Sequence, residues 1–492
     1  MHEDFEACWR AFQSRDPRFD GRVFMAVTST GIYCRPICPV RGPKPENARF
    51  YPTAAAAAAA GFRACMRCRP ETAPGTPEWL GGSAVVVRAV RLIDTGFLDT
   101  RLVADLAREV HVGERQLRRL FLRHLGAPPH LVARTRRAER ARLLLDATDL
   151  PLAEVASAAG YGSRRQFADQ IRAAYGRSPG ELRRRPARRT AVAARAGLTL
   201  RLAFRPPFDW EALLDYLASR AIPGVEAVEG GRYRRVARVG EHVGVVEVER
   251  IADRDAVAVH VAPALLPATV TVAARVRHLL DLDCDGLAIA AVLGDDPWLG
   301  RLVARRPGLR LPGAWDGFEV AVRAVVGQQV TVRGASELAG RLVRAHGTPL
   351  PAPDGALTHA FPAPAALARD DLVELGMPSA ARARAIAALA AACAAGLDLG
   401  PASDPVEVRA ALVALPGIGA WTADYVAMRA LRDPDAFPAA DLGLRRALAV
   451  DGRDATAREA GALAEAWRPW RAYAALHLWQ GLGDDAAQAA VA

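Results

Sequence analysis

A glycine-bracketed turn between two apolar helical patterns is the feature that most restricts how this chain can fold. The turn reads Pro416-Gly417-Ile418-Gly419, and it separates a pattern that ends at Leu415 from one that starts at Ala420. Glycine adopts left-handed backbone angles at little cost and lets another backbone approach closely. Such a turn directs successive N–H groups and a helix N-terminus outward. It therefore predicts a helical hairpin that binds phosphate without reading bases.

A single carboxylate follows this hairpin. Asp441 stands between Ala440 and Leu442, after Pro434 and Pro438 have interrupted the helical pattern. A carboxylate among apolar residues is costly unless it is hydrogen-bonded or has a chemical task. The sequence leaves two interpretations open at this point, an N-cap in a helical loop or a reactive acid beside the hairpin.

The hairpin and its carboxylate resemble the helix-hairpin-helix DNA glycosylases, and the AlkA-type 3-methyladenine branch in particular. The segments that match are LPGIG at 415–419, WTADY at 421–425, FPAAD at 437–441, and two upstream stretches at 307–319 and 324–330. The resemblance implies an all-α helix-hairpin-helix glycosylase domain over 281–492. It also implies that this domain excises N-alkylated purines of the 3-methyladenine type by hydrolysing the N-glycosidic bond.

The same resemblance implies roles for individual side chains. Asp441 would be the catalytic carboxylate, acting either by stabilising an oxocarbenium-like sugar or by activating a water. The base must be flipped out of the duplex, and aromatic rings hold a flat cationic base well. By family position, Trp421, Tyr425 and Trp479 form the base pocket, Gln329 is the wedge that fills the gap, and Pro416, Gly417 and Gly419 contact the DNA backbone. Core packing is the alternative for a tryptophan, and we assign Trp467 and Trp470 to the core.

The scarcity of lysine bears on the reaction. Related bifunctional glycosylases carry a lysine just after the glycine turn, which forms a Schiff base and nicks the strand. Trp421 occupies that place here, and the only lysine in the chain is Lys44. We therefore expect a monofunctional DNA-3-methyladenine glycosylase II without lyase activity.

Two short-spaced cysteine pairs lie near the start of the chain and suit a metal. The set has the spacing CxxxC…CxxC and consists of Cys34, Cys38, Cys65 and Cys68. Four thiolates suit tetrahedral Zn²⁺, and a purely structural zinc is one interpretation. The surrounding residues 24–36, Asn47, Phe50 and 61–68 resemble the Ada-type methylphosphotriester domain. That resemblance implies a small zinc-bound α/β domain in which Cys34, kept as a nucleophilic thiolate, accepts a methyl group from a damaged phosphate in one turnover.

Two similar helical blocks follow, around 102–121 and 152–167. Each has a short alanine-rich amphipathic helix, a tight turn and a helix with basic or polar outward positions. Gly160 suits the second turn, and the recognition helices should begin near Gly113 and Ser163. The duplication resembles the AraC-type double helix-turn-helix, although a solvated basic helix face is the alternative. The candidate DNA contacts are Arg115, Arg118, Arg164 and Arg165.

A segment with alternating apolar residues precedes the glycosylase pattern. The alternation indicates strands at 198–204, 244–248 and 256–261, and 208–220 is typical of one helix. The segment resembles the N-terminal α+β domain of AlkA-type glycosylases. We find no chemistry in it and expect it only to pack.

Charge and length agree with a protein that acts on DNA. The net charge of +11 fits a polyanionic partner. No stretch offers the ~20 uninterrupted apolar residues of a membrane span, and the first residues lack a signal core. We therefore expect a cytoplasmic protein with no membrane partner, in which clustered cysteines bind metal instead of forming disulfides.

The sequence thus predicts a multidomain fusion. Its parts are a zinc-bound α/β domain at 1–78, an all-α AraC-type domain at 79–190, an α+β domain at 195–280 and the all-α glycosylase at 281–492. It would sense phosphotriester damage, regulate transcription and excise alkylated bases, as a monomer with flexible joints near 79–84 and 185–196. Alkylated duplex and promoter DNA are the expected partners, and RNA polymerase is a candidate. The alternatives are a regulator whose glycosylase-like region only binds DNA, and a repair enzyme whose front half only tethers it.

Overall fold

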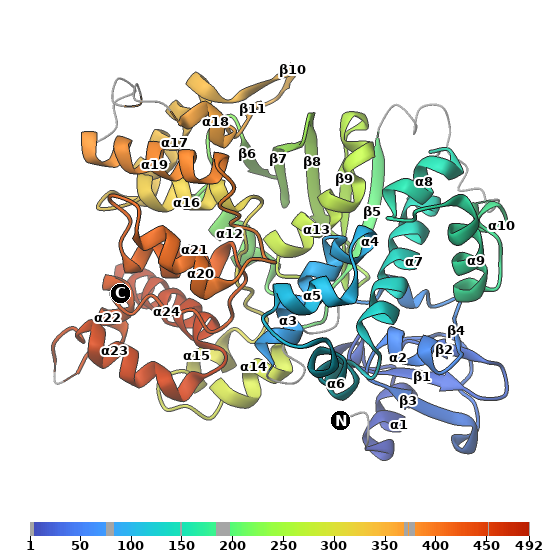
Figure 1. Ribbon diagram of the computed structural model, residues 1–492. Helices are drawn as coiled ribbons and strands as arrows, with labels where there is room; N and C mark the ends of the chain where they lie inside the picture. Colours follow the sequence, from blue (N-terminus) through green and yellow to red (C-terminus); the bar gives the residue numbers. More distant parts are fainter. Residues whose placement is uncertain are drawn as a thin grey trace. The chain divides into compact units, whose positions relative to one another are not determined.

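The chain divides into two compact units. Unit 1 comprises Met1–Pro206, Ile251–Ala273 and Leu282–Cys284, and unit 2 comprises Pro207–Arg250, Ala274–Asp281 and Asp285–Ala492. The computed structural model, drawn in Figure 1, describes residues 4–74, 83–147, 150–183, 197–368, 372, 379–450 and 452–491. The expected joints at 79–84 and 185–196 lie outside the described residues, apart from Ser83 and Ala84.

Unit 1 begins with a small sheet whose strand order is β3-β1-β2-β4. Its strands are β1 (Phe24–Val27), β2 (Ile32–Cys34), β3 (Ala48–Tyr51) and β4 (Arg63–Ala64), with helices α1 (Phe5–Gln13) and α2 (Ala54–Ala59). Strand β1 is antiparallel to β2 and β3, whereas β2 and β4 are parallel. The parallel pair matters because it brings two cysteine-bearing strand ends to the same edge.

Helices follow in the order of a duplicated helix-turn-helix. They are α3 (Ala84–Asp94), α4 (Phe97–Thr100), α5 (Val103–Glu109), α6 (Glu114–Leu125), α7 (Pro129–Ala147), α8 (Leu152–Ala158), α9 (Arg164–Tyr175) and α10 (Pro179–Arg183). The predicted starts of α6 and α9 are confirmed, because Gly113 and Ser163 are their N-caps. Ser163 accepts a hydrogen bond from the Gln166 N–H at 3.1 Å. Gly160 has a φ of +86°, as its predicted turn requires.

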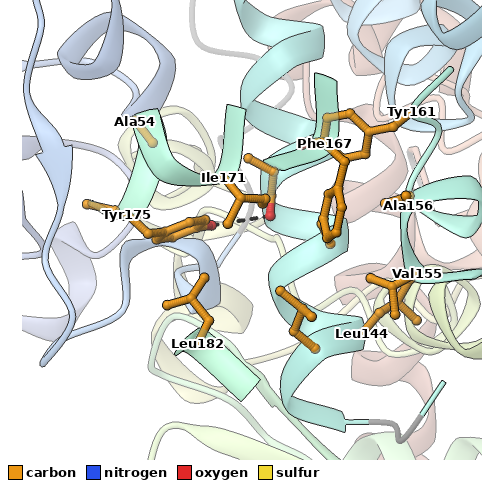
Figure 2. Close-up of a cluster of buried hydrophobic side chains, with 14 of the residues drawn as sticks. Ala54, Leu144, Val155, Ala156, Tyr161, Phe167, Ile171, Tyr175 and Leu182 are labelled. Atoms are coloured by element: carbon orange, nitrogen blue, oxygen red, sulfur yellow. Dashed lines mark hydrogen bonds between the residues drawn. The ribbon is translucent and has the colours of Figure 1, made fainter. Parts of the chain in front are cut away.

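One hydrophobic core joins the small sheet to the second helix-turn-helix. Figure 2 shows Phe167, Ile171 and Tyr175 of α9 beside Leu144 of α7, with Ala54 of α2 nearby. The Tyr175 hydroxyl donates to the Ala138 carbonyl of α7 at 3.3 Å. The two parts therefore share one packed interior within unit 1. The unit is completed by β5 (Leu198–Ala203), antiparallel to β9 (Ala256–Val261), and by a 3₁₀ turn at Pro263–Ala268.

Unit 2 has an antiparallel strand meander and a largely helical body. The meander is β6 (Glu226–Glu229), β7 (Arg232–Val239) and β8 (His242–Arg250), preceded by α12 (Trp210–Ser219); α13 (Thr269–Leu279) has residues in both units. The body contains α14 (Gly286–Leu293), α15 (Gly300–Arg305), α16 (Gly317–Val326), α17 (Val332–His346), α18 (Pro364–Leu367), α19 (Ala380–Ala394), α20 (Pro405–Val413), α21 (Ala420–Arg429), α22 (Leu442–Ala447), α23 (Ala457–Ala464) and α24 (Arg471–Val491), with a hairpin of β10 (Thr348–Asp354) and β11 (Leu357–Ala360).

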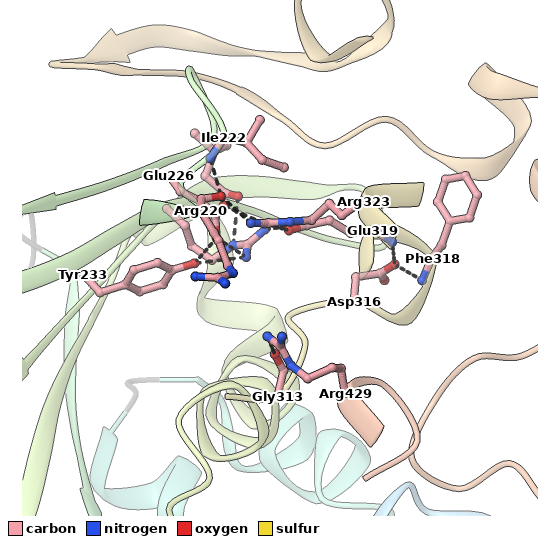
Figure 3. A network of polar contacts seen from close by, with 12 residues as sticks. Arg220, Ile222, Glu226, Tyr233, Gly313, Asp316, Phe318, Glu319, Arg323 and Arg429 are labelled. Atoms are coloured by element: carbon pink, nitrogen blue, oxygen red, sulfur yellow. Dashed lines mark hydrogen bonds and ion pairs between the residues drawn. The ribbon is translucent and has the colours of Figure 1, made fainter. Parts of the chain in front are cut away.

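A buried polar network ties the meander to α16, as Figure 3 shows. Glu226 accepts from the Tyr233 hydroxyl at 2.6 Å and from Arg323 at 2.8 Å. Arg235 donates to Glu319 at 2.7 Å. All four carboxylate oxygens lie among donors, so the burial of these charges is compensated. Arg323 of this network also lines the cavity described below.

The predicted fold class is confirmed by these elements. A small mixed sheet, a double helix-turn-helix, an α+β segment and a helical body follow one another along the chain. Trp467 and Trp470 lie in the core, as expected. Among the described residues, no helix has both the length and the apolar character needed to cross a bilayer.

Candidate active site and metal centre

The four clustered cysteines meet where two parallel strands end. Cys34 is the last residue of β2, and Cys65 follows β4 directly. The strand register places Tyr33 opposite Ala64, which brings these two cysteines side by side. The Sγ atoms of Cys34, Cys38, Cys65 and Cys68 all lie within 4.8 Å of one another.

This cluster fits a Zn²⁺ ion bound by four thiolates. Tetrahedral coordination with Zn–S distances of ~2.3 Å places neighbouring sulfurs ~3.8 Å apart, which agrees with the observed spread. All four side chains are buried. A hydrogen bond with Cys38 raises the pKa of Cys34, and one with Cys34 raises the pKa of Cys68. Hydrogen bonds with Cys34 lower the pKa of Cys38 to about 7 and also lower the pKa of Cys65. Protons shared in this way are displaced when a cation binds, as in a metal-binding set.

A backbone donor distinguishes one of the four sulfurs. The Arg35 N–H donates to the Cys68 Sγ at 3.4 Å. A donated hydrogen bond stabilises a thiolate and weakens it as a nucleophile. In the part of the chain that the structure describes, no backbone N–H donates to the sulfur of Cys34. Among the described residues, Cys68 is therefore the sulfur that the backbone restrains most.

The two recognition helices present their basic residues to solvent. Arg115 and Arg118 on α6, and Arg164 and Arg165 on α9, are all exposed. Among the described residues, only Arg165 of these four is near a carboxylate, that of Asp169 at 3.9 Å. An exposed pair at that distance contributes little to stability, so the four guanidinium groups are available to bind an anion.

The glycine turn joins α20 to α21 with the predicted open geometry. Pro416, Gly417 and Gly419 are exposed. Gly417 has a φ of +76°, and a Cβ there would lie 2.8 Å from the Cβ of Ala385. Gly419 is the N-cap of α21, and a Cβ there would meet nothing within 4 Å. The N-terminus of α21 is thus open to an approaching phosphate.

Gln329 lies in the turn between α16 and α17, near this hairpin. It is exposed, and its φ of +56° is unusual for a residue with a side chain. The preceding Gln328 fixes the turn, because its amide donates to the Gly417 carbonyl at 3.1 Å and to Thr422 at 3.2 Å. Arg382 also donates to the Gln328 carbonyl. The turn that carries Gln329 is therefore bound directly to the hairpin.

Asp441 caps a helix and also collects two indole donors. Its Oδ1 accepts from the Leu444 N–H of α22 at 3.0 Å and from Trp479 Nε1 at 2.8 Å. Its Oδ2 accepts from Trp421 Nε1 at 2.9 Å. The ring of Trp421 stacks on Tyr425 with 5.5 Å between centroids and 15° between planes. The N-cap interpretation is correct, and the same carboxylate also faces a cavity.

That cavity, of about 640 Å³, brings together the carboxylate and the predicted aromatic residues. Asp441, Trp421, Tyr425 and Trp479 all line it. The volume is in the range of small-molecule sites. Gln329 and the exposed turn residues Pro416, Gly417 and Gly419 are not among its lining residues.

One wall of the cavity comes from α12, so the expectation that 195–280 only packs is wrong. The Tyr216 hydroxyl lies 3.2 Å from that of Tyr425. Arg429 donates to both, at 2.6 Å to Tyr425. The sequence signal was a stripe at helical spacing that includes Asp215, Tyr216 and Arg220. Sequence reasoning missed it because a polar stripe on a helix usually faces water.

Three family models match the chain in succession. They are the metal binding domain of Ada over residues 7–71, a helix-turn-helix domain over 106–185 and the AlkA N-terminal domain over 199–316. The zinc ligands, the recognition helices and α12 each lie within one of these matches.

Relatives match both the whole chain and its second half. A protein of Mycobacterium tuberculosis, described as a probable bifunctional transcriptional activator/DNA repair enzyme AlkA, is 48% identical over 97% of each chain. DNA-3-methyladenine glycosylase 2 of Escherichia coli is 37% identical over 56% of this chain and 95% of its own. Among solved structures, a 3-methyladenine DNA-glycosylase from Archaeoglobus fulgidus matches with a TM-score of 0.50 and 23% identity, covering 57% of this chain and 97% of that one. This last match shows only the fold, and only that of the second half of the chain.

Proposed function

This chain belongs to the family of bifunctional transcriptional activators and DNA repair enzymes that join an Ada-type front half to an AlkA-type glycosylase, and on that premise we propose its activities. It excises N-alkylated purines, such as 3-methyladenine, from DNA. It also accepts methyl groups from DNA methylphosphotriesters on a zinc-bound cysteine and regulates transcription. Zinc is the cofactor, held by the four-cysteine cluster.

The excision reaction is assigned to Asp441. An N-alkylated purine is cationic, so it leaves with the electron pair of the C1′–N bond and needs no general acid. The sugar that remains is oxocarbenium-like, and a water adds to C1′ with loss of a proton. The observation that carries this assignment is the carboxylate at the cavity wall, fixed by two indole N–H groups. A fixed negative charge stabilises the developing positive charge without reorganisation.

The remaining residues of unit 2 hold the DNA. Trp421, Tyr425 and Trp479 offer ring faces and edges to an extruded base, with cation–π energies of roughly 0.5–2 kcal/mol. Gln329 fills the gap left in the duplex. The open hairpin turn at Pro416, Gly417 and Gly419 binds backbone phosphates through its N–H groups.

The glycosylase is monofunctional on this proposal. No lysine is present in unit 2, since the only lysine is Lys44. Trp421 follows the hairpin turn, and an indole nitrogen cannot form a Schiff base with the sugar. The product is therefore an intact strand with an abasic site.

Cys34 is the proposed methyl acceptor. Its thiolate attacks the methyl carbon, the S–CH₃ bond forms as the O–CH₃ bond breaks, and the phosphodiester leaves with the electron pair. Zn²⁺, when bound, keeps the cysteine sulfurs deprotonated at neutral pH. The thioether product is stable, so each chain reacts once.

The double helix-turn-helix at 79–190 then binds promoter DNA. Arg115, Arg118, Arg164 and Arg165 supply base and phosphate contacts from α6 and α9. We propose that the protein works as a monomer and that RNA polymerase is the partner through which bound DNA changes transcription.

Base release tests the excision function. Full-length protein is given alkylated duplex DNA, and free 3-methyladenine and 7-methylguanine are followed for wild type and Asp441→Asn. Asparagine keeps the N-cap of α22 but removes the charge and can accept from only one of the two indoles. Release should fall by a factor on the order of 10³, and a melting curve checks that the variant is folded. Abasic strands should stay unbroken. Absence of release from folded wild type would favour a regulator whose second half only binds DNA.

A further inference from the structure

A cluster of two phenols and an arginine forms one end of the cavity. Arg429 is buried and donates to the hydroxyls of Tyr216 and Tyr425. Its other nitrogens donate to the backbone carbonyls of Pro312 and Gly313, as Figure 3 shows for Gly313. Arg429 thus has a fixed position, and both phenols line the cavity.

One hydroxyl proton of this cluster has no acceptor among the described residues. A guanidinium group only donates, so each phenol oxygen must accept from Arg429. One phenolic proton forms the hydrogen bond between Tyr216 and Tyr425, which lie 3.2 Å apart. Within the described part of the chain, no further acceptor is found for the second phenolic proton. That proton is free to bind a group that enters the cavity.

The charges around Tyr216 strengthen its hydroxyl as a donor. The guanidinium groups of Arg220 and Arg429 lie 4.0 and 4.9 Å from its ring centroid. Neither arginine forms an ion pair with a carboxylate among the described residues. Burial raises the pKa of Tyr216, but Arg429 and Arg220 outweigh it and bring the pKa to about 8. Burial raises the pKa of Tyr425 to about 12. Both phenols therefore keep their protons at neutral pH.

Trp421 separates this donor end from Asp441. Its Nε1 donates to the carboxylate, while its ring stacks on Tyr425. A base that extends from a sugar at Asp441 past Trp421 would meet the two phenols. 7-Methylguanine keeps an acceptor at O6, although its N7 is methylated, whereas 3-methyladenine presents an amino group at the position that matches O6.

We propose that Tyr216 and Tyr425, positioned by Arg429, form a hydrogen-bond-donating end of the base cavity that favours alkylated purines with a carbonyl oxygen at C6 over those with an amino group at C6. This inference rests on the proposed glycosylase function and assigns it a preference for guanine-type lesions. Tyr216 is then a specificity residue, contributed by a helix outside the hairpin region.

The test compares two released bases in one reaction. Duplex DNA carrying labelled 7-methylguanine and 3-methyladenine is incubated at pH 7 with full-length wild type or Tyr216→Phe, and the two first-order release rates are measured. Phenylalanine keeps the ring and its cation–π contacts with Arg220 and Arg429, and it loses the hydroxyl that accepts from Arg429. We expect 7-methylguanine release to fall roughly tenfold, the effect of leaving a carbonyl without its donor. Release of 3-methyladenine should stay within about twofold, because it has no carbonyl to lose.

Controls separate this inference from the function on which it rests. Tyr473→Phe removes a phenol that donates to buried Asp281 at 2.8 Å in the same unit, outside the cavity, and should leave the ratio of the two rates unchanged. Asp441→Asn should lower both releases by a factor on the order of 10³. A ratio of the two rates that stays unchanged in folded Tyr216→Phe, whether or not both rates fall, would overturn the specificity role. Failure of wild type to release either base would overturn the glycosylase function and this inference with it.

Discussion

The carboxylate of Asp441 is oriented by donors from three places in unit 2. Leu444 belongs to the helix that Asp441 caps, whereas Trp421 and Trp479 come from α21 and α24. A carboxylate on a free loop would sample many rotamers and would have to be ordered during the reaction. Here the helix cap and the two indoles fix it before DNA arrives, which is the arrangement that electrostatic stabilisation requires.

At the same scale, buried His477 of α24 should make the stability of unit 2 depend on pH. Burial lowers its pKa from 6.5 to about 4, so the imidazole is neutral in the folded protein. The unfolded chain binds a proton below pH ~6.5. Above pH ~6.5, His477 therefore does not lower the stability of the folded state. As the pH falls through 6.5 toward 4, protonation of the unfolded chain lowers the free energy of unfolding by about 3 kcal/mol in total.

Thermal unfolding of wild type and His477→Leu at pH 7.5 and pH 5 checks this prediction. Leucine cannot take up a proton, so the melting temperature of the variant relative to wild type should rise on acidification. An identical difference between the two proteins at both pH values would contradict the assignment to His477.

At the scale of elements, the hairpin turn contains two glycines whose substitution by alanine should affect stability differently. Gly417→Ala places a side chain at a φ of +76° and 2.8 Å from the Cβ of Ala385. We expect it to lower the free energy of unfolding by at least ~1–2 kcal/mol. Gly419→Ala meets nothing within 4 Å, so it should cost only the ~0.5–1 kcal/mol by which alanine is a poorer N-cap than glycine.

The same pair separates folding from DNA contact. A methyl group on Gly419 stands where a phosphate would approach the N-terminus of α21, so affinity for a duplex with an abasic site should fall roughly fivefold, the cost of one weakened hydrogen bond. Melting temperatures and gel-shift titrations of both variants provide the measurement. Unchanged affinity of Gly419→Ala would mean that the phosphate does not approach this turn.

Local signals in the sequence were sufficient for some elements and not for others. Ser163 and Gly160 were identifiable because a cap and a left-handed turn depend on neighbouring residues. Strand β7 was missed because buried Arg235 breaks the apolar alternation, and its partner Glu319 lies in α16. A buried charge is compatible with a strand only when its partner is known, and the sequence does not show that partner.

The candidate site divides in the same way. Asp441, Trp421 and Tyr425 lie within one short stretch, and a family resemblance identifies such a stretch from sequence. Tyr216 is 209 residues away from Tyr425, and its place in the cavity depends on how α12 packs. The polar stripe of α12 is visible in the sequence, but a single sequence does not show which element that stripe packs against.

At the scale of the whole molecule, each proposed chemistry is assembled within one unit. The four cysteines belong to unit 1, and all residues that line the cavity belong to unit 2. The segment around 195–280 is shared, because β5 and β9 belong to unit 1 while β6 to β8 belong to unit 2. A truncation near 195 would therefore remove strands from unit 1 as well as the whole of unit 2, and point substitutions are the cleaner test.

Two such substitutions should separate the chemistries completely. Cys34→Ser removes the proposed nucleophile and a zinc ligand, so methyl uptake should drop from one group per chain to none while base release continues. Asp441→Asn should do the reverse. Cys8→Ala removes another buried thiol of unit 1 and should keep both activities. Labelled methylphosphotriester DNA and labelled alkylated DNA, given to each full-length variant, measure the two outcomes. Loss of base release by Cys34→Ser, with unit 2 still folded, would show that the two chemistries are coupled. Cys34 belongs to unit 1, whereas every residue that lines the cavity belongs to unit 2.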